Sequence, residues 1–257
     1  MPAERIGNGT HACFAIPGWG EDRNCYLPLV AQLGPGTCLY SVDPPGYGNT
    51  APPPEYSFEA VAELLQREYE EASRLEGRPI DTLLGNCSGA LFACELALRL
   101  DPAPRRLLLV DPFAFLPGYF RVFLRRDFGR HAYNSTFANP VGRWLTNVLA
   151  SGREDRSTDM TQSFRSVDHE VTYRYLEMFG THPGIDRFSS LDCEVRIATG
   201  ERTFAAVKKS VQMWQDLWPH AIVTSIPACG HLPIREAPEG LCEALFSNIP
   251  VSQEVAR

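Results

Sequence analysis

The sequence of 257 residues lacks the features of several protein classes. No apolar run approaches the roughly 20 residues that a membrane-spanning helix needs. The first ten residues contain no apolar core of a signal peptide. Acidic residues outnumber basic ones, and the resulting formal net charge of −7 argues against general nucleic-acid binding. We therefore expect a cytoplasmic protein with neither a nucleic-acid nor a membrane partner.

Metal-binding and cofactor-binding patterns are also missing. The eight cysteines are dispersed, with no Cys-x-x-Cys pair and no Cys/His cluster at zinc spacing. No dinucleotide fingerprint is evident, so we expect no metal and no bound cofactor. Seven of the cysteines are interpreted as reduced, mostly buried thiols, because a free cysteine in an apolar segment behaves as a small hydrophobe.

Cys87 is the exception, because it lies at the centre of the motif Gly85-Asn86-Cys87-Ser88-Gly89. A short apolar run precedes this motif and a helical pattern follows it. Strand, sharp turn and helix with flanking glycines are typical of a nucleophile elbow, whose central residue is usually serine. The two glycines centre the motif on Cys87 and not on Ser88. A cysteine nucleophile acts as a thiolate, so the rest of the chain must supply a base.

Apolar strands alternate with amphipathic helices over most of the chain, which predicts an α/β fold with a mainly parallel sheet covered on both faces. Residues 113–190 interrupt this alternation: they contain no lysine, are rich in Phe, Tyr and Arg, and favour helices over 118–128, 140–150 and 167–179. We expect a core of residues 1–112 and 191–257, with a helical cap or lid over 113–190. The remaining helices are expected over 58–75, with Ser57 as the N-cap, over 205–217 and over 238–247.

Several further motifs follow in a fixed order: Pro17-Gly18-Trp19-Gly20, Asp43-Pro44-Pro45-Gly46-Tyr47-Gly48, the elbow, Asp111, and Gly230-His231-Leu232-Pro233. Together they resemble the α/β-hydrolase superfamily over nearly the whole chain. The resemblance implies that Cys87 is the nucleophile and His231 the base. It also implies that the backbone N–H groups of Trp19 and Ser88 form the oxyanion hole.

The triad acid departs from the usual superfamily pattern. The late loop that carries an aspartate in many members reads Gly200-Glu201-Arg202-Thr203, and a threonine cannot serve as the acid. In thioesterases of polyketide and nonribosomal-peptide biosynthesis the acid follows the strand after the elbow helix, a position that corresponds to Asp111. The chain resembles those thioesterases in this respect and in its helical lid. Glu201 remains the rival acid.

The resemblance implies an acyl-processing enzyme that acts on a thioester or activated ester through an acyl-cysteine, by hydrolysis or by acyl transfer or cyclisation in a biosynthetic pathway. The alternatives are a lactone or enol-ester hydrolase with a cysteine nucleophile, or a non-catalytic small-molecule binding module on the same fold. Phe113, Phe115, Tyr119, Phe120 and Phe123 are candidates for an acyl pocket. A basic run is a candidate docking patch for an acyl-carrier protein or coenzyme A; it comprises Arg121, Arg125, Arg126 and Arg130.

Overall fold

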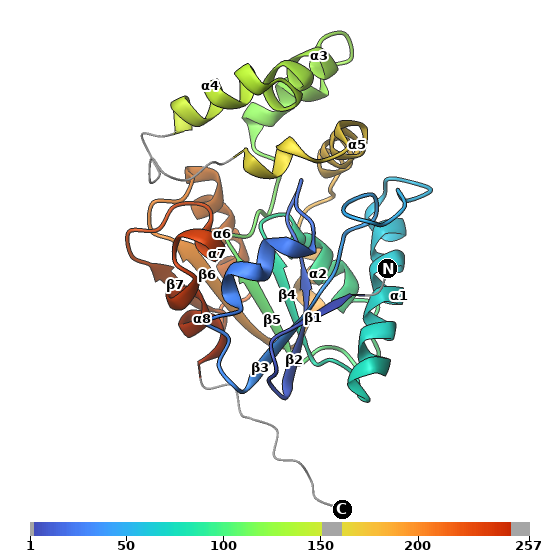
Figure 1. The fold of residues 1–257 in the computed structure, drawn as a ribbon, viewed down its shortest axis with the longest axis vertical. Helices are drawn as coiled ribbons and strands as arrows, with labels where there is room; N and C mark the ends of the chain where they lie inside the picture. The colour runs from blue at the N-terminus through green and yellow to red at the C-terminus, as the bar shows by residue number, and fades with distance from the viewer. Residues whose placement is uncertain (1–2, 151–160, 248–257) are drawn as a thin grey trace, which may run out of the picture.

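A seven-stranded sheet with the order β1-β3-β2-β4-β5-β6-β7 forms the centre of the molecule (Figure 1). The computed structural model describes residues 3–150 and 161–247. Only the edge strand β1 runs antiparallel to its neighbour; the other neighbouring pairs are parallel. The strands are β1 (Glu4–Ile6), β2 (His11–Ile16), β3 (Thr37–Ser41), β4 (Thr82–Asn86), β5 (Arg106–Val110), β6 (Glu194–Gly200) and β7 (Ile222–Ile226). The expected α/β fold with a mainly parallel sheet is confirmed, although the short strand β1 was not foreseen.

Helices cover both faces of the sheet, and alternate residues of each strand point to opposite faces. In β2, Phe14 and Ile16 pack in one apolar cluster, whereas Cys13 and Ala15 pack in the other. The first cluster contains residues of α1 (Phe58–Glu76), α2 (Gly89–Ala97) and α6 (Ala205–Leu217). The second contains residues of the 3-10 helix η1 (Arg23–Leu29), α7 (Pro233–Glu236) and α8 (Pro238–Phe246). The central strands β2, β3 and β4 are buried on both faces along their whole length, whereas the edge strands β1 and β7 are partly exposed.

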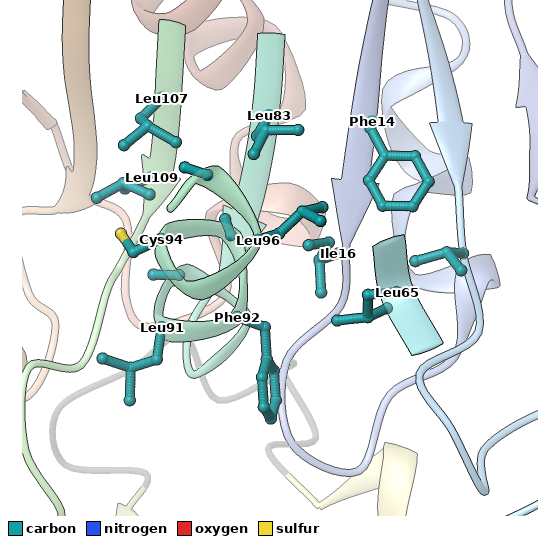
Figure 2. Packing of buried hydrophobic residues seen from close by; sticks show 14 of the residues in the cluster. Phe14, Ile16, Leu65, Leu83, Leu91, Phe92, Cys94, Leu96, Leu107 and Leu109 are labelled. Carbon is teal, nitrogen blue, oxygen red and sulfur yellow. The ribbon is translucent and has the colours of Figure 1, made fainter. Parts of the chain in front are cut away.

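The helix that follows the elbow is buried along its whole length. All nine residues of α2 are inaccessible or nearly so. Figure 2 shows α2 with Leu91, Phe92, Cys94 and Leu96 beside the strand residues of the same core cluster. Such a helix has little freedom to shift, so the residue at its start is held in place by the core.

Helix α1 begins and ends as its sequence predicts. The Ser57 hydroxyl accepts the N–H of Ala60 at 3.2 Å, and Gly77 closes the helix in the left-handed conformation with φ 77°. The expected N-cap is therefore confirmed.

The segment between β5 and β6 is helical and lies over the carboxyl edge of the sheet (Figure 1). It contains η2 (Gly118–Leu124), α3 (Gly129–Tyr133), η3 (Asn134–Ala138), α4 (Pro140–Ala150), η4 (Gln162–Arg165), α5 (His169–Phe179) and η5 (Asp186–Ser190). The helix expected over 118–128 ends at Leu124, because the backbone of Arg125 is extended with ψ 128°. The boundaries 1–112, 113–190 and 191–257 for core and cap stay a prediction. None of the helices in the described parts of the chain combines the length and the apolarity needed to cross a bilayer.

Two glycines of the elbow allow backbones to approach closely. A Cβ atom on Gly85 would lie 2.6 Å from Ala90 Cα, and one on Gly89 would lie 2.4 Å from Ile16 O. Both contacts are with backbone atoms of the packed core, which cannot rotate away.

Gly85→Ala and Gly89→Ala are each expected to lower the free energy of unfolding by about 1–3 kcal/mol or more, because the added methyl group overpacks the core. Urea denaturation measures the change. Gly34→Ala is the control, since a Cβ there meets no atom within 4 Å. Equal stability of all three variants would contradict the close-approach argument.

Candidate active site

The register of the sheet brings the elbow and Asp111 to the same edge. Asn86, the last residue of β4, is paired with Val110, the last residue of β5. Cys87 and Asp111 follow these two residues directly, so they lie side by side at the ends of adjacent strands. Cys87 has a φ of 54°, a left-handed conformation that costs a non-glycine residue about 1–3 kcal/mol. Its backbone N–H donates to Val110 O at 2.8 Å, which extends the ladder by one bond. The sharp turn expected at Cys87 is present.

His231 lies beside Cys87, on the loop between β7 and α7. Its Nε2 is 3.7 Å from Cys87 Sγ, and its Nδ1 is 2.9 Å from Asp111 Oδ2. Burial alone would lower the pKa of His231, but the interactions with Asp111 and Cys87 outweigh it and raise the pKa well above its usual range. The loop comes this close because residue 200 is glycine: a Cβ there would lie only 1.8 Å from Gly230 O.

Asp111 is fully buried, and its carboxylate is surrounded by donors. Besides His231, Thr199 Oγ1 donates to it at 2.7 Å, Gly200 N at 2.9 Å and Thr203 Oγ1 at 2.6 Å. A buried carboxylate needs such partners to remain charged. With φ 41°, Asp111 is also in the left-handed region.

The structure separates the two candidate acids. Glu201 is exposed and accepts the backbone N–H of Ala228 at 2.8 Å, so it does not face the imidazole. Thr203, at the usual acid position, instead supports Asp111, and its hydroxyl oxygen lies 3.2 Å from His231 Nδ1. The geometry thus brings Cys87, His231 and Asp111 together and leaves Glu201 aside. Their catalytic roles stay predictions.

The two residues expected to supply the oxyanion donors lie close together, Trp19 on the loop after β2 and Ser88 at the elbow. The backbone N–H of Trp19 donates to Ser88 Oγ at 2.9 Å. The side chain of Ser88 therefore affects the Trp19 N–H group, because its hydroxyl oxygen accepts the hydrogen bond from it. The Ser88 amide itself has no hydrogen-bond acceptor among the described residues.

An apolar cavity of about 480 Å³ opens above Cys87 and His231. All five aromatic residues expected at an acyl pocket line it. The aromatic lining comprises Trp19, Phe113, Phe115, Tyr119, Phe120, Phe123, Phe137, Phe164, Phe179 and Phe204. Most of these residues belong to the segment between β5 and β6, so that segment and the sheet edge build the cavity jointly.

Trp19 links the loop after β2 to the segment between β5 and β6. Its indole ring packs edge-on against Phe164 at 4.9 Å and Phe137 at 5.4 Å between ring centroids. Its indole N–H donates to the backbone oxygen of Thr172 in α5 at 2.8 Å. The tryptophan side chain at residue 19 therefore contributes to the packing of this loop, independently of its backbone N–H.

Glu21 is a cavity residue that sequence reasoning missed. Its side chain lines the cavity, accepts a hydrogen bond from Asn86 Nδ2 at 2.8 Å and lies 3.8 Å from Arg235 Nη2. Burial raises the pKa of Glu21. Glu21 directly follows Pro17-Gly18-Trp19-Gly20, and this position could have indicated a site residue. The local sequence does not distinguish such a residue from an exposed acid on a loop.

The other seven cysteines play no part in this cavity. All eight thiols are free, six of the seven others are buried and Cys193 is half-buried. Burial raises the pKa of all seven, in the case of Cys193 to about 11. Within residues 3–150 and 161–247 no group of His, Cys, Asp and Glu has the arrangement of a metal site.

The fold and this edge of the sheet define a class: a parallel α/β sheet with an elbow cysteine, a histidine and a buried aspartate beneath a helical segment. The sequence profile of the alpha/beta hydrolase family matches residues 14–244. The chain belongs to the alpha/beta hydrolase family, as the order of its motifs indicated.

Curated relatives align with the chain over nearly its full length. It is 25% identical to a pimeloyl-acyl-carrier-protein methyl ester esterase of Klebsiella pneumoniae, covering 95% of each chain. It is 22% identical to the esterase of the same description from Yersinia pseudotuberculosis, covering 94% of each.

Solved structures share the fold. A thermophilic esterase from Thermogutta terrifontis superposes with a TM-score of 0.72 at 19% identity, covering 94% of this chain and 89% of that one. MenH from S. aureus superposes with a TM-score of 0.70 at 15% identity, covering 95% of this chain and 98% of that one.

Asp111→Asn is expected to lower kcat for an acyl substrate by about 100-fold or more, because an amide can neither fix the imidazole tautomer nor stabilise the imidazolium. Glu201→Gln should change kcat by less than about twofold, since its carboxylate faces Ala228. Steady-state kinetics on the purified variants checks the ranking. The reverse order would assign the acid to Glu201.

Proposed function

We propose that this chain is an acyl-processing enzyme that forms an acyl-cysteine on Cys87. The observation that carries the proposal is the line of contacts from Cys87 Sγ to His231 Nε2, and from His231 Nδ1 to Asp111, opening into an apolar cavity. A binding module has no need of a strained cysteine beside a histidine that is itself held by a buried carboxylate.

The residues have distinct roles in the proposed reaction. His231 Nε2 takes the thiol proton and the Cys87 thiolate attacks the acyl carbonyl carbon. Negative charge then develops on the carbonyl oxygen, where the Ser88 and Trp19 N–H groups stabilise it. The backbone N–H of Trp19 can donate to that oxygen once its hydrogen bond to the Ser88 hydroxyl breaks. Collapse of the intermediate releases the leaving group and leaves a thioester on Cys87.

The substrate class follows from the nucleophile and the cavity. A thiolate exchanges with a thioester at little thermodynamic cost, so a cysteine nucleophile suits thioesters and activated esters. The aromatic lining suits an apolar acyl chain or an aromatic acyl group, whose burial contributes about 25 cal/mol per Å². Hydrolysis and transfer to a second nucleophile both proceed from the same acyl-cysteine.

A carrier-linked substrate is the second part of the proposal. The curated relatives act, by their description, on a methyl ester linked to acyl-carrier protein. In this chain Arg121, Arg125 and Arg126 are exposed near the cavity-lining residues of η2, and no ion pair joins them to any residue in the described parts of the chain. Arg130 instead pairs with Glu170. An acidic carrier or the phosphates of coenzyme A would complement the three exposed guanidinium groups.

Exposure to a small apolar acyl thioester is expected to add one acyl mass to the protein, and Cys87→Ala should abolish the adduct. Intact-mass spectrometry measures it. Cys193→Ala is the matched control, since that thiol is also accessible in part yet lies outside the cavity. An adduct that persists in Cys87→Ala would contradict the acyl-cysteine. No adduct and no turnover with thioesters, esters and lactones would favour a binding module, and turnover of lactones alone would favour the lactonase.

Reversing Arg125 and Arg126 to glutamate is expected to lower kcat/KM for a carrier-linked substrate by about tenfold or more at low salt, because the docking attraction becomes repulsion. The effect should shrink as salt is added, and activity on a short thioester should not change. Arg67→Glu with Arg74→Glu is the matched control on the exposed side of α1. Unaltered kinetics on the carrier-linked substrate would exclude the patch as a docking site.

A further inference from the structure

One carboxylate shares the cavity with the nucleophile. Glu21 ends the tight turn that begins at Gly18, with a backbone bond of 3.1 Å from Glu21 N to Gly18 O. Its side chain is only 11% exposed and points inward to the lining of the cavity. Among the residues that line the cavity in the described chain, Glu21 is the one acid.

Glu21 is close to the reacting centre. A Cβ on Gly18 would lie 3.0 Å from Cys87 Cβ and 3.2 Å from Glu21 Oε2, so the carboxylate and the nucleophile border the same glycine. The hydrogen bond from Asn86 Nδ2 ties Oε2 to the residue that precedes Cys87. Oε1 is left facing Arg235 at 3.8 Å, beyond hydrogen-bond distance. One carboxylate oxygen is thus fixed and the other is still able to accept a hydrogen bond.

The second half of the reaction creates a need for a base. A leaving thiolate does not require a proton, so His231 can remain an imidazolium after a thioester has acylated Cys87. The buried Asp111 carboxylate, 2.9 Å away, favours that charged form. An imidazolium cannot accept the proton of an incoming nucleophile. A carboxylate whose pKa is raised by burial accepts a proton more readily than an exposed one.

We infer that Glu21 is a second acid–base group of the site, which takes the proton of the nucleophile that resolves the acyl-cysteine. The nucleophile's O–H or N–H proton moves to Glu21 Oε1 as its heteroatom bonds to the acyl carbon. The carbon–sulfur bond then breaks and the sulfur leaves as a thiolate. Glu21 finally releases its proton to solvent, where the proton offsets the thiolate that left in the first step. The Cys87 thiolate stays paired with the His231 imidazolium, ready for the next acylation. This inference rests on the proposed function.

Glu21→Gln separates a chemical role from a positioning role. Glutamine keeps the size of the side chain and an oxygen that accepts from Asn86, but it cannot take a proton. We expect the burst of released thiol to form at the wild-type rate, the decay of the acyl-cysteine to slow by about 100-fold or more, and the acylated mass to accumulate to one per protein. Rapid-quench kinetics with intact-mass detection measures both steps.

Glu95→Gln is the matched control, because Glu95 is also buried with a pKa raised by burial but lies outside the cavity lining. Equal decay in Glu21→Gln and wild type would overturn the inference, as would equal slowing of both steps. If Glu21→Gln does not fold, Glu21→Asp serves: it keeps a carboxylate withdrawn by one methylene, and slowed decay with intact acylation is again expected. Absence of both thiol release and an acylated mass in the wild type and in Glu21→Gln would instead overturn the proposed function.

Discussion

The hydrogen bond between Asp111 and His231 is the interaction on which the arrangement of the site depends. A fully buried carboxylate must be surrounded by donors, and here they come from the end of β6, from the loop after it and from the histidine loop. The same hydrogen bonds therefore compensate the buried charge and fix the relative positions of the end of β5, the loop after β6 and the histidine loop. Without Asp111, the loops after β6 and β7 would lose their common anchor.

The position of Asp111 affects which side chain the neighbouring loop supplies. Thr203 lies where many relatives of this fold carry the acid, and its hydroxyl donates to Asp111. A neutral donor at that position adds a hydrogen bond to the carboxylate, whereas a second carboxylate would repel it. The exchange of an acid for a hydroxyl at residue 203 thus fits an acid placed at the end of β5.

The segment between β5 and β6 and the loop after β2 are in contact through aromatic packing. Trp19 follows the glycine that borders Cys87, and its ring packs among Phe137 and Phe164 of the segment between β5 and β6. A Cβ on Gly20 would lie 3.2 Å from the Phe164 ring, so the loop backbone also rests on that residue. A displacement of that segment would therefore move both the wall of the cavity and the loop that contains Trp19.

Local patterns determined the elements and several of the site residues. Apolar runs and helical periodicity indicated the alternation of strands and helices, because the buried side chains of a strand or a helix recur at a fixed spacing. The order of the motifs indicated the family and drew Cys87, His231 and Asp111 together. The choice between Asp111 and Glu201 stayed open, since it depends on where two loops meet.

Tertiary structure decided what local sequence cannot express. Glu21 and the Ser88 hydroxyl take their positions from contacts with Asn86 and Trp19, and the Trp19 and Ser88 contact joins residues 69 positions apart. The aromatic residues of the cap are as compatible with ordinary packing as with a cavity wall until the chain places them over Cys87. Sequence alone thus determined the scaffold and the family motifs, whereas the chain's path in space decided which carboxylate contacts His231 and which side chains surround Cys87, because contacts between distant segments leave no periodic signal.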